Sequence, residues 1–251
     1  MSKNKKVEKL KDFLYEFAQS VSYNEEISKN YLEENDIDVE KFVSKGIKQI
    51  EATLKKKDVQ KSKALFFKRV VLAAEIVYNL YFERTFGHVK LQKLMYLCEQ
   101  VSNMELSSRY TKQAAGPCDG KFMHSIDREL ERQKWFNIEI KQESNYRTYE
   151  YSLGERVDSY KAYYNNYYSE NLDSIKWLIE TFRKPHTKKV ELVATIYSCL
   201  EEFIKNKEEF TSDLLLQRVM DWSLEKKKKF TPMDVSNAHE WMIEKGLVPK
   251  S

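Results

Sequence analysis

The stretch KALFFKRVVLAAEIVYNLYFE, residues 63–83, decides the fold. Its apolar side chains would cover nearly the whole circumference of a helix, with Val70, Val71, Leu72, Ala73 and Ala74 in an unbroken run. A helix that is apolar on every side is buried. We therefore expect residues 63–83 to form the central helix of the main domain.

The composition agrees with a mostly helical chain. Of 251 residues, 41% are hydrophobic and 33% are charged, and only six are glycine and four proline. This scarcity of Gly and Pro argues against β-sandwiches and glycine-rich phosphate loops. The formal net charge is only +4, far from the charge density of a protein that wraps nucleic acid.

The cysteines and the N-terminus favour a cytoplasmic protein. Cys98, Cys118 and Cys199 are odd in number and lack metal-ligand spacing, so we expect reduced thiols. The opening residues MSKNKKVEKLKD contain no apolar run that could serve as a signal peptide. No stretch approaches the roughly 18 apolar residues of a membrane span, so no membrane partner is expected.

The residues before the central helix predict a separate arm. We place an N-terminal helical arm at 1–60 and a compact domain at 61–251. Residues 5–20 form an amphipathic helix that carries Phe13 and Phe17, and the acidic segment 25–40 carries Glu33 and Glu34. A further helix is expected to begin near residue 39, and LKKKDVQKSKA (54–64) is the best linker candidate because it is charged and poor in apolar residues.

The tightest backbone is expected within RYTKQAAGPCDGKFMHSID, residues 109–127. Ala114, Ala115, Gly116 and Pro117 are small or turn-forming, and Asp119 is well placed to cap a helix over 119–133. We interpret these five residues as a structural turn, with Gly116 allowing close packing.

The same turn has two alternative interpretations, a loop that contacts a partner and a loop with a chemical role. Cys118 and His124 are its only local Cys/His pair, and Asp119 would be a base, yet a nucleophile also needs a third group to orient its base. The histidines share no zinc spacing, and no P-loop is present, so no metal or cofactor is expected. A nuclease-type Glu139-Ile-Lys141 lacks a strand that would supply its aspartate. We expect a protein that is not an enzyme.

A β-hairpin is predicted near 136–153. NIEIKQ (137–142) and RTYEYSL (147–153) alternate in polarity, and ESNY between them is a turn signal. A helix followed by a two-stranded wing is the order of a winged-helix unit. The fold class expected is mostly α (α+β): a helical domain with a winged-helix-like unit that carries one small antiparallel hairpin.

The last third continues as helices. The tyrosine-rich segment 156–168 presents Tyr163 and Tyr167 along one edge, as packing residues or as a partner-binding surface. TPMD (231–234) is a strong helix start, and Gly246 with Pro249 is a strong stop.

Three stretches carry a resemblance: FGHVKLQKLMYLCEQ (86–100), RYTKQAAGPCDGKFMHSIDRELERQKWF (109–136) and FTPMDVSNAHEWMIEKGLVPK (230–250). Together they resemble a module found at the C-terminus of some type I restriction specificity subunits and in stand-alone prokaryotic proteins. The KLQKL…AAGP core is also similar, more distantly, to the Panacea antitoxin domain. Cys118 stands where that pattern has Tyr, and Gly120 where it has Pro.

The resemblance implies a prokaryotic defence or toxin–antitoxin accessory protein that binds and neutralises a partner protein: an effector, a toxin or a subunit of a restriction complex. The arm would occlude the partner. The candidate contacts are Phe13, Phe17, Glu33 and Glu34 on the arm, and Tyr163 and Tyr167 in the compact domain.

The alternative function is a DNA-binding accessory or repressor protein, associated with a type I restriction system. Its candidate contacts are Lys121, Arg128 and Arg132 on the 119–133 helix and Lys141 and Arg147 on the wing. The basic run 226–229 would add phosphate contacts. Acidic residues intervene on the helix, so we expect at most weak binding to duplex DNA.

Overall fold

The computed structural model describes residues 26, 30, 34, 39–106, 108–142 and 147–249. The chain divides into two compact units, Met1–Ser62 and Lys63–Ser251. The predicted fold class is confirmed, because the described residues are mostly helical with two small antiparallel strand pairs. None of the helices described is long and apolar enough to cross a membrane.

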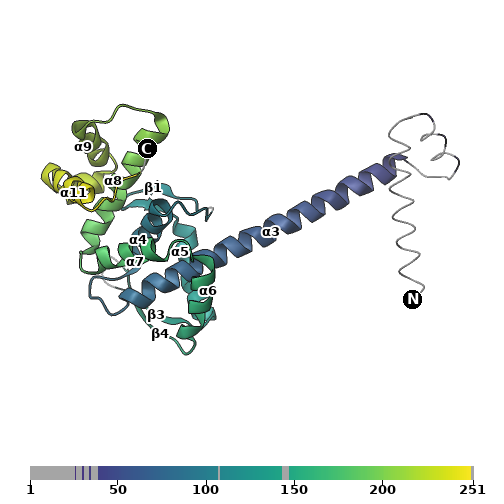
Figure 1. Ribbon diagram of the computed structural model, residues 1–251, viewed down its shortest axis with the longest axis horizontal. Coiled ribbons are helices and arrows are strands. Elements are labelled where there is room, and N and C mark those ends of the chain that lie inside the picture. The colour runs from purple at the N-terminus through teal and green to yellow at the C-terminus, as the bar shows by residue number, and fades with distance from the viewer. Residues whose placement is uncertain are drawn as a thin grey trace. The chain divides into compact units, whose positions relative to one another are not determined.

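The elements carry the labels of Figure 1. In chain order they are α3 (Val39–Leu80), α4 (His88–Val101), β1 (Thr111–Gln113), β2 (Gly116–Cys118), α5 (Gly120–Arg132), β3 (Phe136–Gln142), β4 (Arg147–Leu153), the 3-10 turn η1 (Val157–Ser159), α6 (Tyr160–Tyr167), α7 (Leu172–Arg183), α8 (Thr187–Asn206), α9 (Ser212–Met220), α10 (Leu224–Lys229) and α11 (Pro232–Glu244).

The second half of α3 is the buried helix that the sequence predicts. From Val70 to Ala74, and again at Ile76, Val77 and Leu80, its side chains have no exposed surface. Burial of this many aliphatic side chains is a large hydrophobic contribution, of roughly 1.5–3 kcal/mol for each fully buried one.

The predicted linker at 54–64 is wrong. Residues 54–64 are helical, and α3 runs without interruption from Val39 to Leu80. Leu, Lys, Gln and Ala make up most of this stretch, and all four have high intrinsic helix propensity. The charged residues 54–64 therefore continue the helix, although they are poor in apolar side chains.

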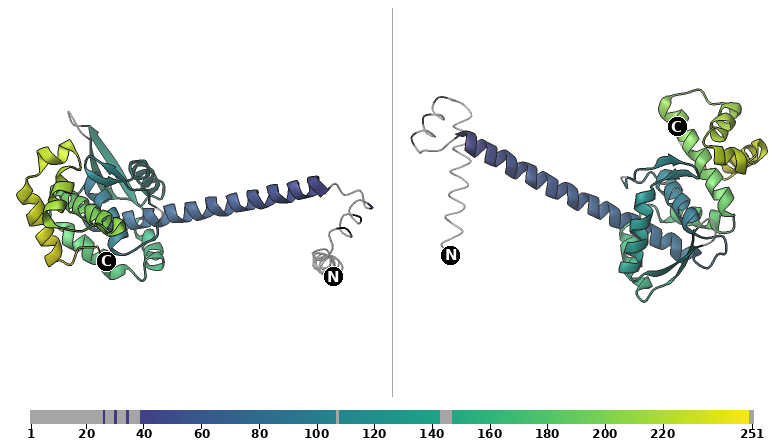
Figure 2. Two further views of the ribbon diagram at one scale, coloured as in Figure 1. Left: turned by 90° about the horizontal axis from the view of Figure 1, so that it is seen from above. Right: turned by 180° about the vertical axis from the view of Figure 1, so that it is seen from behind.

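The core of the second unit lies around α8. This helix packs against α4 and β2 and also against α9 and α11 (Figures 1 and 2). Cys98 on α4 and Cys199 on α8 are fully buried.

The β3–β4 hairpin is confirmed at the predicted place. The strands pair antiparallel from Phe136 opposite Leu153 to Gln142 opposite Arg147, and α5 packs against β3. At its base the backbone approaches so closely that a Cβ on Gly154 would lie 2.3 Å from the carbonyl oxygen of Lys134. Only glycine fits there without a shift of the backbone.

A second hairpin, β1–β2, was not predicted. Thr111 pairs with Cys118 and Gln113 with Gly116, which leaves Ala114 and Ala115 as the turn. Gly116 and Pro117, expected in the turn, lie instead in strand β2. Strands of three residues carry too little alternation to be recognised in a sequence.

The helix ends predicted from capping residues are confirmed. The Thr231 hydroxyl accepts from the Asp234 N–H, and the Asp234 carboxylate accepts from the Thr231 N–H, which is a complete capping box with Pro232 at the first helical position. After α11, Gly246 has a φ of 65°, in the left-handed region that favours glycine at a helix end.

Candidate functional site

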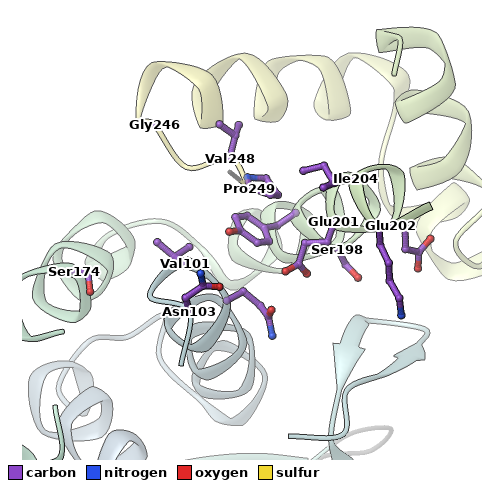
Figure 3. Close-up of a pocket in the computed structure, with 13 residues that line it drawn as sticks. Val101, Asn103, Ser174, Ser198, Glu201, Glu202, Ile204, Gly246, Val248 and Pro249 are labelled. Carbon is purple, nitrogen blue, oxygen red and sulfur yellow. The ribbon is translucent and has the colours of Figure 1, made fainter. Parts of the chain in front are cut away.

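A cavity of about 690 Å³ lies between the end of α4, the second half of α8 and the C-terminal residues 246–249 (Figure 3). We call it the polar cavity. Its lining includes two carboxylates, Glu201 and Glu202, and one cation, Lys205, all from α8. The other lining residues are Gln100, Val101, Asn103, Ser174, Tyr197, Ser198, Ile204, Gly246, Val248 and Pro249.

Glu201 is held in place by α4. Its Oε2 atom accepts a short hydrogen bond from the hydroxyl of Tyr96, a residue that is almost fully buried. Burial raises the pKa of Glu201, and the hydrogen bond from Tyr96 opposes that rise. Burial and the neighbouring Glu201 carboxylate raise the pKa of Tyr96, so the phenol stays protonated and remains the donor.

A second cavity, of about 470 Å³, adjoins the first and is lined mostly by apolar side chains. We call it the apolar cavity. Ile204, Val248 and Pro249 line both cavities, so the two form one cleft along α8. The other residues that line the apolar cavity come from α8, α11 and the loop between α8 and α9: Leu200, Phe203, Lys207, Glu208, Phe210, His239 and Ile243.

The rim of the apolar cavity exposes large apolar side chains. Ile204, Phe210 and Ile243 are 44%, 45% and 57% exposed, and Val248 beside them is 37% exposed. Single exposed apolar residues are ordinary, but a group of them around a concave surface is typical of an interaction site. No sequence signal marked this group, because its members come from parts of the chain that lie far apart in the sequence.

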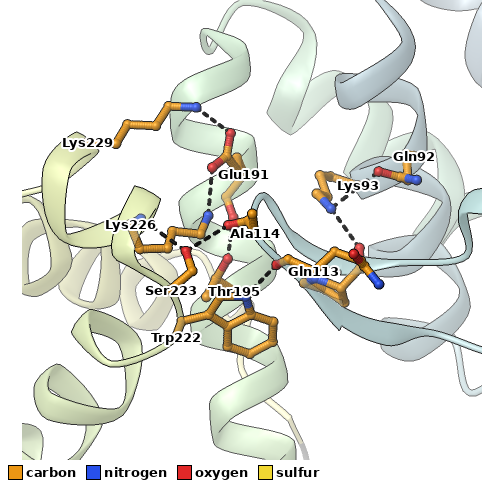
Figure 4. Close-up of polar contacts among 11 residues, drawn as sticks. Gln92, Lys93, Gln113, Ala114, Glu191, Thr195, Trp222, Ser223, Lys226 and Lys229 are labelled. Carbon is orange, nitrogen blue, oxygen red and sulfur yellow. Dashed lines mark hydrogen bonds and ion pairs between the residues drawn. The ribbon is translucent and has the colours of Figure 1, made fainter.

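The β1–β2 hairpin is anchored to the C-terminal helices (Figure 4). The indole N–H of Trp222 donates to the Gln113 carbonyl at 2.7 Å, and the Ser223 hydroxyl donates to the Ala114 carbonyl at 3.2 Å. Gly116 has a φ of 100°, and a Cβ at this position would lie 2.7 Å from Thr195 Oγ1 on α8. The hairpin thus brings two distant parts of the chain into contact.

A buried charge cluster lies beneath this hairpin (Figure 4). The Glu191 carboxylate accepts from Lys226 at 2.7 Å and from Lys229 on its other oxygen. The Lys226 side chain is buried, so the prediction that the whole run 226–229 offers solvent-exposed phosphate contacts is wrong. Ser223 caps α10 and turns Lys226 inward.

Lys93 and Cys118 lie on the other side of the hairpin. The Lys93 ammonium donates to the Pro117 carbonyl at 2.7 Å, and burial lowers the pKa of Lys93 to about 8. The Gln92 amide donates to Cys118 Sγ at 2.7 Å. Burial nevertheless raises the pKa of the Cys118 thiol, which disfavours the thiolate that a nucleophile requires.

Asp119 is the N-cap of α5, the role expected from the sequence. Its Oδ1 atom accepts from the Phe122 N–H at 3.3 Å, and its Oδ2 atom lies 3.2 Å from both terminal nitrogens of Arg69. The guanidinium of Arg69 also lies over the Phe122 ring, 3.0 Å from its centroid. Asp119 therefore joins the start of α5 to α3.

Two of the five candidate DNA contacts, Arg132 and Lys141, are paired with carboxylates. Arg132 forms two hydrogen bonds to Glu129, and Lys141 lies 2.6 Å from Glu150. Arg147 donates to Gln142 across the hairpin, and Arg128 is exposed. The Lys121 side chain lies outside the described residues. Helix α5 and the β3–β4 hairpin are therefore each close to charge-balanced.

The candidate partner contacts are divided between the two units. Phe13, Phe17 and Glu33 lie outside the described residues, and Glu34 is helical and exposed. On α6, Tyr163 is exposed and Tyr167 half-buried; these two rings stack 6.3 Å apart, and the Tyr163 ring meets Phe67 edge-on at 5.2 Å. That contact gives Tyr163 a packing role.

The structure also pairs two residues that the sequence did not connect. His88 Nε2 lies 2.9 Å from Asp127 Oδ2, and the His88 ring stacks on Tyr149 at 4.1 Å. The Tyr151 hydroxyl donates to the other oxygen of Asp127. This group joins the start of α4 to α5 and β4. Among the described residues, no cluster of three or more His, Cys, Asp or Glu side chains could hold a metal ion.

No protein-family model matches this sequence, and the comparison with curated proteins gives no match. The resemblance to the restriction-associated module and to the Panacea domain therefore stays a prediction.

Proposed function

We propose that this protein binds and regulates a partner protein, without catalysis, in the defence or toxin–antitoxin setting that the resemblance implies. The observation that carries the proposal is the cleft along α8, where the polar and the apolar cavity adjoin. Protein-binding surfaces combine a desolvated apolar centre with a polar rim. The side chains of Ile204, Phe210 and Ile243 would supply that centre.

Two features support binding over catalysis. The Cys118 thiol has a raised pKa, and Asp119 is engaged as a helix cap and as the partner of Arg69. Both residues are thus occupied in holding the hairpin and α5. The cleft, by contrast, offers a partner protein a surface on which to bury apolar side chains, because most of the residues that line its apolar half are aliphatic or aromatic.

The DNA-binding alternative is less well supported. A surface that binds phosphates needs cations whose charge is not already neutralised. Arg132 and Lys141 each contact a carboxylate, and Lys226 is buried against Glu191. Binding of a phosphate would have to displace these pairs.

A titration with duplex DNA separates the two functions. At physiological salt, the full-length protein should bind a 30-base-pair duplex at most weakly, at about micromolar Kd or above, with affinity that falls as salt rises and is the same for unrelated sequences. Fluorescence anisotropy would measure it. Sequence-selective binding at nanomolar Kd would overturn our proposal, and loss of that binding in Arg128→Ala would assign it to α5.

A further inference from the structure

The cleft along α8 has a chemical asymmetry that restricts what it can bind. We ask which kind of partner segment fits this cleft, and the answer rests on the proposed function. The polar cavity offers the carboxylates of Glu201 and Glu202 against one cation, Lys205, and adds the side-chain amides of Gln100 and Asn103. Its lining therefore carries an excess of negative charge and of hydrogen-bond acceptors.

Both carboxylates are available to a ligand in different ways. Glu201 is fixed by the Tyr96 hydroxyl at one oxygen, which leaves its other oxygen without a hydrogen bond from any described residue. Glu202 forms no ion pair or hydrogen bond with any residue in the ranges that the structure describes. Figure 3 shows both side chains, with Ser198, on the face of α8 that lines the cavity. A cation placed there would meet one carboxylate that Tyr96 holds in place and a second, Glu202, that has no competing partner among the described residues.

The adjoining half of the cleft suits a different group. Phe203, Phe210 and His239 form a row of edge-to-face rings, with centroids 5.7 and 5.8 Å apart. The one carboxylate in its lining, Glu208, is already paired with Arg218. The one lysine in its lining, Lys207, is exposed, so its ammonium group can stay in water while a bulky apolar side chain is buried beside it.

The two halves share Ile204, Val248 and Pro249, so a single ligand can reach both. We infer that the cleft binds a segment of a partner polypeptide in which an arginine or lysine lies a few residues from a bulky apolar residue. The cation occupies the cavity lined by Glu201 and Glu202, and the apolar side chain occupies the cavity lined by Phe203, Phe210 and Ile243. Arginine fits best, because its five donors can bond to several acceptors at once.

Selection from a displayed library of random 12-residue peptides tests this inference on the full-length protein. Peptides should be enriched that join Arg or Lys to Leu, Ile, Phe, Met or Trp within about four residues, and acidic peptides should be depleted. Binding of the best peptide, measured by fluorescence anisotropy, should weaken roughly tenfold in Glu202→Lys, the effect of about 1.4 kcal/mol. It should be lost in Ile204→Asp.

Two surface variants serve as controls. Glu131→Lys on α5 makes the same charge change outside the cleft, and Trp177→Asp on α7 makes a similar change at another exposed apolar residue. Both should bind the peptide as the wild type does. Circular dichroism and thermal unfolding of all four variants show whether each one is folded.

A charge exchange gives the sharpest result. A peptide whose Arg is replaced by Glu should bind wild type at least tenfold more weakly and should regain affinity for Glu202→Lys. Enriched peptides that depend on Ile204 but contain no cation would overturn the inference and leave the proposed function standing. If binding of none of the enriched peptides depends on Ile204, both the inference and the proposed function are contradicted. Concentration-dependent self-association lost in Ile204→Asp would instead identify a second copy as the occupant.

Discussion

Replacing Glu191 by glutamine is expected to lower the free energy of unfolding by about 3–5 kcal/mol. Glu191 and Lys226 are 4% and 1% exposed, and Lys229 contacts the other carboxylate oxygen. Removal of the carboxylate leaves the Lys226 ammonium buried without an anion, close to another buried cation, Lys93. Glutamine keeps the shape of the side chain, so the loss reports the charge. Urea unfolding followed by circular dichroism would measure it.

The matched control is Asp221→Asn. Asp221 pairs with Lys227 at 2.7 Å, the same distance as the Glu191–Lys226 contact, but both partners are half-exposed. Exposed pairs contribute at most about 1 kcal/mol, so this variant should unfold almost as the wild type does. The double variant Glu191→Leu/Lys226→Leu should be more stable than Glu191→Gln, because it removes the uncompensated charge together with its partner. A loss below about 1 kcal/mol in Glu191→Gln would contradict the account of this cluster.

Gly116→Ala should destabilise the protein by about 2–4 kcal/mol. A φ of 100° is a conformation that costs a residue with a Cβ about 1–3 kcal/mol. The new Cβ would also lie 2.7 Å from Thr195 Oγ1, which donates to the Glu191 carbonyl at 2.8 Å. Strand β2 and α8 would have to move apart. Thermal and urea unfolding would measure the loss.

Two further variants separate the causes. In Gly116→Ala/Thr195→Ala the hydroxyl is gone, so the part of the loss due to the close contact should be recovered and the part due to φ should remain. Gly120→Ala is the control, because a Cβ there would meet only Cys118 Sγ at an ordinary 3.7 Å. That change should be neutral or slightly stabilising. If Gly116→Ala were as stable as the wild type, the hairpin would have room for a Cβ at this position, and the account of the close contact would be contradicted.

Local patterns predicted the elements whose cause is local. The apolar circumference of 70–80 predicted a buried helix, alternation predicted β3–β4, and Thr231 with Asp234 predicted the start of α11. Each of these depends on side chains within a few turns of one another. The same reasoning failed at 54–64, where low apolar content was interpreted as a linker although the helix propensity is high.

Long-range contacts could not be predicted in this way. A run of lysines is usually a solvated face, yet Lys226 is buried because Glu191 lies opposite it on α8. The cleft depends on α4, α8, α11 and the chain end meeting in space, and its residues share no motif. His88 and Asp127 likewise come together only because the start of α4 lies against α5 and β4. Sequence spacing carries no information about these pairs.

Site-specific photo-crosslinking in the cells of origin tests the central claim, that the cleft along α8 binds a partner protein. A photoreactive benzoylphenylalanine replaces Ile204 in the cleft or Trp177 on α7, a control that is also exposed and apolar. We predict a protein adduct of one defined mass from position 204 and none from position 177. The account would be contradicted if position 204 gave no adduct, or if both positions gave the same ones.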